Sequence, residues 1–156
     1  RCLSDWSSDV CSSDLENNLL IFTLLTLKQN PQISPILNQV KRIFKYSART
    51  IIEDSFNIKE YDDLFGKFVF KKSFPTWMIN PVLGADRLFI TRLYSFCPSL
   101  VDIYLGVLQN NLELFQRGVP DTEHAHYLTI PKQYLIEFDN LNCWGWLAGN
   151  GQVEKY

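Results

Sequence analysis

The sequence predicts a mainly α-helical protein, an irregular bundle of about five helices with room for one short extended pair. Three observations favour this fold class. Apolar residues recur at steps of three and four along most of the chain, Ser34–Pro35 and Asn80–Pro81 are typical helix starts, and Gly118 follows the best candidate helix end. The 156 residues, 46% of them hydrophobic, are enough to bury a core.

The first fifteen residues are expected to be foreign to the natural protein. Residues 5–15 read DWSSDVCSSDL, which matches the conceptual translation of a common sequencing-library adapter. We therefore expect residues 1–15 to be non-native and disordered, and residues 16–156 to form a single helical domain that is a fragment of a larger protein.

Removing residues 1–15 changes the charge and the cysteine count. One Arg and three Asp are lost, which leaves 14 basic and 14 acidic residues, and the cysteines that remain are Cys97 and Cys143. A neutral domain is not held to nucleic acid by net charge alone. Two cysteines in this length fit a reducing compartment, so we expect a soluble, cytoplasmic protein, and their pairing stays open.

The first natural element is an apolar run at residues 19–27, LLIFTLLTL. It is too short to span a bilayer, which takes about 20 residues. We predict a buried helix that ends before Pro31. The alternative, the end of a longer membrane or signal segment, stays open because its signal would lie upstream.

Residues 34–57 form the clearest predicted helix, capped by Ser34 and started by Pro35. An apolar stripe along it would face a core. Its other side carries a ridge of basic residues that is either a solvated face or a surface for phosphate or nucleic acid: Lys41, Arg42, Lys45 and Arg49.

The middle of the chain predicts two more helices. Residues 58–65 favour a short helix or turn, residues 67–74 a strand or extended connector, and residues 81–96 a helix. Residues 98–117 form a helix that is apolar on two faces, which predicts a central position or packing against a partner outside this chain.

The C-terminal third has weaker signals. Residues 119–130 predict an extended segment, and residues 131–142 fit either a helix or a strand, with the helix favoured. Residues 142–151 form a turn-rich aromatic segment. Its Trp144 and Trp146 are candidates for stacking on a ligand, although packing of an irregular terminus is the favoured explanation.

The densest polar cluster contains the only two histidines of the chain. In an extended segment, residues two apart point to the same side, and two imidazoles with a carboxylate suit a zinc or iron ion. The candidate metal ligands are Asp121, Glu123, His124 and His126. The competing interpretation is an exposed loop.

No motif predicts a catalytic residue or a cofactor. The leading hypothesis is a non-catalytic protein-interaction or structural module, whose partner is another protein or the remainder of the same chain. The alternatives are a metal-dependent enzyme fragment that uses the cluster at residues 121–126, and a nucleic-acid-binding surface on the ridge at residues 41–49. Nucleic acid is the less favoured partner, and a membrane partner stays open.

Overall fold

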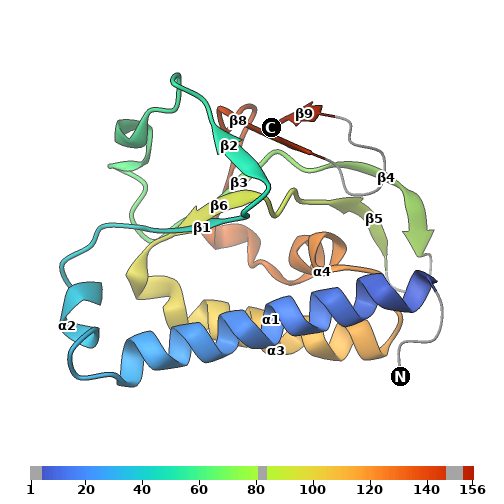
Figure 1. Cartoon of the computed structure of the whole chain (residues 1–156), viewed down its shortest axis with the longest axis horizontal. Helices are drawn as coiled ribbons and strands as arrows, with labels where there is room; N and C mark the ends of the chain where they lie inside the picture. The colour runs from blue at the N-terminus through green and yellow to red at the C-terminus, as the bar shows by residue number, and fades with distance from the viewer. Residues whose placement is uncertain (1–4, 81–83, 147–152) are drawn as a thin grey trace.

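The structure is a computed structural model that describes residues 5–80, 84–146 and 153–156. Within these ranges the chain forms four α-helices and nine strands in three sheets (Figure 1). The predicted helical bundle is therefore wrong, and the protein has a mixed α/β fold. No helix of the described part is long and apolar enough to cross a membrane.

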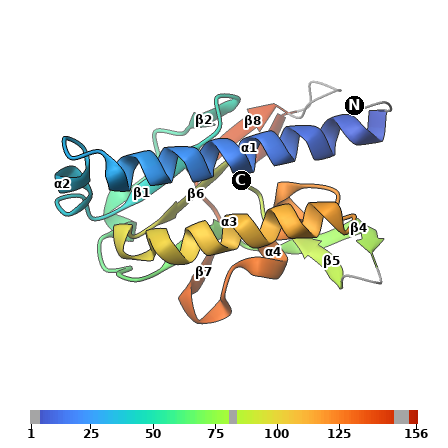
Figure 2. The same cartoon turned by 90° about the horizontal axis from the view of Figure 1, so that it is seen from below.

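Two long helices form one layer of the molecule. Helices α1 (Asp5–Gln29) and α3 (Val101–Gln116) lie side by side (Figure 2). The inner side of α1 packs on the main core through Leu20, Ile21, Leu24 and Leu27. The helix predicted at residues 19–27 is thus confirmed. Because α1 also includes residues 5–15, it crosses the boundary expected at residue 16, and the adapter origin of residues 1–15 stays a prediction.

Helix α3 confirms the helix predicted at residues 98–117. A short 3-10 turn, η2 (Pro98–Leu100), leads into it, and Gly118 follows its end with a φ of 96°, which favours glycine. Tyr104, Leu105 and Val107 are all buried. The apolar side chains of this helix therefore pack within this chain, and the helix lies with α1 in the outer layer (Figure 2).

A four-stranded sheet backs the helices, in the order β1 (Ile43–Tyr46), β6 (Leu93–Phe96), β3 (Phe68–Lys71) and β7 (Leu135–Phe138). The pairs β1–β6 and β6–β3 are antiparallel, and β3–β7 is parallel. The strand predicted at residues 67–74 is confirmed by β3. The helix favoured at residues 131–142 is wrong, since that segment forms η3 (Lys132–Tyr134) and then β7.

The helix predicted at residues 34–57 is also wrong. Only α2 (Ser34–Leu37) is helical, and the chain then forms β1, β2 (Thr50–Ile52) and the 3-10 helix η1 (Ile58–Tyr61). The apolar residues of this segment are mostly β-branched or aromatic, and such residues favour strands when a partner is available. Strand β6 supplies that partner, with Phe44 opposite Ser95.

The helix predicted at residues 81–96 is wrong, since the described residues of this segment, 84–96, form two strands. Strand β4 (Phe74–Asn80) pairs with β5 (Ala85–Leu88), and β6 follows. Gly84, before β5, has a φ of 68° that a helix could not accommodate. Pro81, on which the helix start was based, lies outside the described residues.

A third sheet joins distant segments in the order β2, β8 (Cys143–Trp146) and β9 (Val153–Lys155). Gly145 lies opposite Thr50, and a Cβ atom built on Gly145 would lie 2.8 Å from the carbonyl oxygen of Arg49. The strand pair therefore requires glycine at this position.

Candidate functional site

The cluster of candidate metal ligands lies on a helix, so its expected extended conformation is wrong. Helix α4 (Thr122–Thr129) begins after Asp121, whose carboxylate accepts a hydrogen bond from the backbone N–H of His124 at 2.9 Å. This aspartate cap followed by Glu123 is a helix-start signal that the sequence contained.

The helix points the two histidines in different directions, since residues two apart on a helix do not face each other. Each imidazole is buried and has its own hydrogen-bond partners. Among the described residues no group of three His, Cys, Asp or Glu side chains could hold a metal ion.

His124 connects α4 to β4. Its Nδ1 lies 2.7 Å from Asp121 Oδ1, and its Nε2 lies 3.0 Å from Thr76 Oγ1. Because the carboxylate can only accept, Nδ1 carries a proton, and Nε2 and the Thr76 hydroxyl share the second hydrogen bond. This hydroxyl–imidazole–carboxylate order is that of an activated nucleophile. His124 and Thr76 are only 1% and 9% exposed, however, so the chain of bonds holds elements together in the interior.

His126 is the centre of a buried polar network. Its Nδ1 lies 2.8 Å from the Thr122 carbonyl oxygen and its Nε2 lies 3.0 Å from the Tyr104 hydroxyl. The Asn111 side chain, 3.2 Å from Nδ1, continues the network to Asn17 on α1. Burial is the main reason that the pKa of His126 falls to about 4, so the imidazole is neutral.

The predicted basic ridge is not assembled, because its residues do not share a helix. Lys41 pairs with Asp62 at 3.4 Å, and Lys45 pairs with Glu16 at 2.5 Å. The Arg42 guanidinium is half-buried and donates to the carbonyl oxygens of Lys67 and Leu64 and to the Ser95 hydroxyl. Arg49 alone of the four is exposed without a hydrogen bond or ion pair to another described side chain.

A polar pocket of about 310 Å³ lies beside the first turn of α4. It brings together a part of each predicted set, with three basic and three acidic side chains in its wall: Glu16, Lys45, Arg49, Arg92, Asp121 and Glu123. Burial, and then the neighbouring charge of Asp121, raises the pKa of Glu123 to about 7. Arg92 carried no signal in the sequence, because only the loop between β5 and β6 brings it to this pocket.

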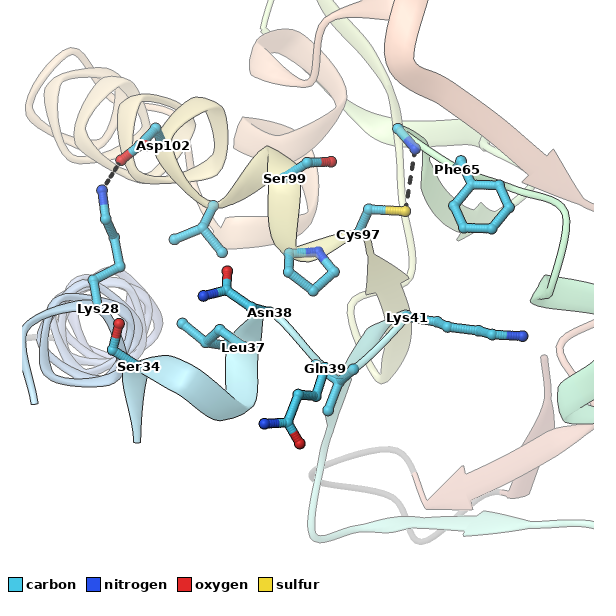
Figure 3. A pocket seen from close by; sticks show the side chains of 14 residues that line it. Lys28, Ser34, Leu37, Asn38, Gln39, Lys41, Phe65, Cys97, Ser99 and Asp102 are labelled. Carbon is cyan, nitrogen blue, oxygen red and sulfur yellow. Dashed lines mark hydrogen bonds and ion pairs between the residues drawn. The ribbon is translucent and has the colours of Figure 1, made fainter. Parts of the chain in front are cut away.

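A larger cavity of about 580 Å³ lies where the end of α1, α2 and the start of α3 meet (Figure 3). The buried Cys97 thiol accepts a hydrogen bond from the Gly66 N–H at 3.1 Å, and an ion pair joins Lys28 to Asp102 on the other side of the cavity. The polar groups named here have partners within the chain, so they explain the fold around this cavity rather than a ligand.

The two tryptophans do not form a described stacking site. Trp144 is partly buried in β8 opposite Lys155, and the side chain of Trp146 lies outside the described residues. Cys97 and Cys143 are both buried and free.

The most exposed apolar surface of the described residues lies along one side of α1. We define the α1 outer face as Leu15, Leu19, Phe22 and Leu25. Leu19 is 61% and Phe22 is 68% exposed, whereas Leu24 on the inner side is 4% exposed. The steps of four, three and three keep these side chains on one line. The helix is therefore apolar on two sides, and this chain covers only one of them.

No family model matches the chain, and no curated protein matches it.

Proposed function

We propose that the chain is a non-catalytic interaction module that pairs with a second copy of itself through the α1 outer face. The observation that carries this proposal is the exposure of Leu19 and Phe22 one turn apart on a helix whose opposite side is in the core. Contiguous exposed apolar surface is typical of interaction sites. Neither residue belongs to the segment predicted to be adapter.

Charge favours a second copy over a charged partner. Residues 17–27 contain no charged side chain. The charged residues at either end, Glu16 and Lys28, are used in ion pairs with Lys45 and Asp102. Two copies of this face can therefore meet without bringing like charges together, and a two-fold contact of a face with itself is the commonest way in which subunits associate.

The spacing of the α1 outer face suits packing of one helix on another. In the part expected to be natural, Leu19, Phe22 and Leu25 are three residues apart and lie along one side of the helix, where they can contact a second helix. We also propose a cytoplasmic location, which is supported by the two free cysteines.

The other functions considered from the sequence have less support. A metal-dependent enzyme would need ligands that converge, and the two histidines lie in separate hydrogen-bond networks. A nucleic-acid surface on the basic ridge would need free cations, whereas Lys41, Arg42 and Lys45 have partners within the chain.

Sedimentation of the full chain over a range of concentrations tests the proposal. We expect a dimer that dissociates in the variants Leu19→Glu and Phe22→Glu. Ile58→Glu is the matched control, because Ile58 is 61% exposed but lies on η1, away from α1 in the sequence. A wild-type monomer at all concentrations overturns the proposal, and a monomer that binds neutral phosphatidylcholine vesicles through Phe22 would replace it with a membrane-surface function.

A further inference from the structure

The polar pocket beside α4 has a charge distribution that suggests a ligand. We propose that this pocket binds the phosphate group of a small phosphate monoester through the guanidinium groups of Arg49 and Arg92. Arg49 comes from the loop between β1 and β2, and Arg92 comes from the loop between β5 and β6. The pocket thus lies where two loops meet the first turn of α4, which is a common position for a binding site.

The three cations of the pocket differ in what they contact. The ammonium group of Lys45 has two partners within the chain. It pairs with Glu16 at 2.5 Å and donates to the Thr91 carbonyl oxygen at 2.9 Å. Arg49 and Arg92 form no ion pair with any described carboxylate. The Arg92 guanidinium lies near the Glu123 carboxyl and the Tyr156 hydroxyl, and it can donate to that hydroxyl. Arg49 therefore remains available to an anion, and Arg92 has further N–H groups to offer one.

Each carboxyl group of the pocket has a contact within the chain. Glu16 is paired with Lys45, and Asp121 Oδ1 accepts from the backbone and the ring of His124. Burial raises the pKa of Glu123 to about 7, and the only described hydrogen bond of its carboxyl group is a long one, 3.5 Å from the Thr91 N–H. While Glu123 is protonated, the pocket has three cations against two carboxylates, and the Glu123 carboxyl can itself donate to an anion.

Phosphate fits this arrangement better than a carboxylate does. A guanidinium group binds phosphate oxygens with two parallel hydrogen bonds, and two guanidinium groups match the two charges of a phosphate monoester. The hydroxyl group of Ser47 also lines the pocket and can donate to a third oxygen. The volume of about 310 Å³ exceeds that of the phosphate group and leaves room for the organic part of the ligand.

Titration calorimetry of the full chain with inorganic phosphate at pH 6 tests the proposal. We expect saturable binding that Arg49→Gln and Arg92→Gln each weaken about tenfold or more, since a hydrogen bond to a charged group contributes about 1.5–3 kcal/mol. Arg117→Gln is the matched control, because Arg117 is exposed at the end of α3 and does not line the pocket. Acetate should bind more weakly than phosphate.

Binding should also weaken as the pH rises through about 7, because Glu123 then becomes negatively charged. The titratable and charged groups around it are the α4 cap Asp121, His124 on α4, Arg92 on its loop, Tyr156, and the remaining pocket residues Glu16, Lys45 and Arg49. Phosphate gains negative charge in the same range, so Glu123→Gln separates the two effects, and we expect tighter binding in that variant at pH 8.

Three results would overturn the proposal: no saturable binding of phosphate, equal binding by wild type and Arg49→Gln, or an equal loss in Arg117→Gln. Because Arg49 is exposed and has no described side-chain partner, Arg49→Gln should fold normally. It carries the test if Arg92→Gln does not fold.

Discussion

The Tyr104 hydroxyl lies 3.0 Å from His126 Nε2, and both side chains are fully buried. Tyr104 is on α3 and His126 is on α4, so this contact joins the two helices inside the core. The same hydroxyl contacts Tyr94 on β6, which extends the connection to the central sheet. A buried polar group without a partner is costly, and this relationship therefore fixes how the three elements pack.

The neutral state of His126 predicts lower stability in acid. Its pKa is lowered to about 4 in the fold, whereas the unfolded chain takes up the proton near the ordinary value of 6.5. The unfolded state binds more protons between these values, so stability is lost as the pH falls from about 6.5 to about 4, by up to about 3 kcal/mol. Urea unfolding of wild type and His126→Gln at pH 7.5 and pH 4.5 checks this, because the variant should lose much of the pH dependence.

The raised pKa of Glu123 predicts a loss of stability as the pH rises, which is the opposite of the trend for His126. Its pKa is raised to about 7 in the fold against 4.5 in the unfolded chain, so its contribution to stability falls as the pH rises between these values. Since the side chain is partly exposed, we expect a loss of about 1–2 kcal/mol, less than the full shift implies. Thermal unfolding at pH 5 and pH 8 should show this loss in wild type and in Glu113→Gln, an exposed control, but not in Glu123→Gln. A loss that persists in Glu123→Gln would assign it to another group.

Alanine substitution should have opposite effects on the free energy of unfolding at Gly145 and at Gly106. Gly145→Ala places a Cβ 2.8 Å from the Arg49 carbonyl oxygen and should destabilise the fold by about 1–3 kcal/mol. Gly106, in the interior of α3, has nothing within 4 Å of an added Cβ, so Gly106→Ala should stabilise the protein by about 0.5–1 kcal/mol. Denaturant titration measures both, and equal effects would contradict the close approach of β2 and β8.

The Asp121 cap predicts a graded effect on α4. Asp121→Ala removes the acceptor for the His124 backbone N–H and for its ring, which should cost about 1–2 kcal/mol. Asp121→Asn keeps an oxygen that can cap the helix and should cost less. Chemical unfolding ranks the two variants, and an equal loss in both would show that the negative charge, rather than the cap, stabilises this end of the helix.

The helices around residues 19–27 and 98–117 could be predicted because each has an apolar face and a distinct end. The segments at residues 34–57 and 81–96 could not, because their apolar spacing fits a helix and their conformation depends on strands far along the chain. Ile43, for example, is in a strand because Phe96 lies opposite it.

The polar pocket beside α4 shows the same limit of local patterns. Arg49 and Asp121 were both candidate residues, but for different functions and on elements with the wrong conformation. What brings them together is the approach of the loop after β1 to the start of α4, and no local pattern along the sequence predicts that contact.

The parallel pairing of β3 with β7 has a consequence for synthesis on the ribosome. Phe68 pairs with Leu135, and both α3 and α4 lie between them in the chain. Such distant contacts slow folding, because a long loop must close before the pair forms. The edge of β3 that faces β7 therefore stays unpaired until residues 135–138 have been translated, and until then this edge can associate with other chains.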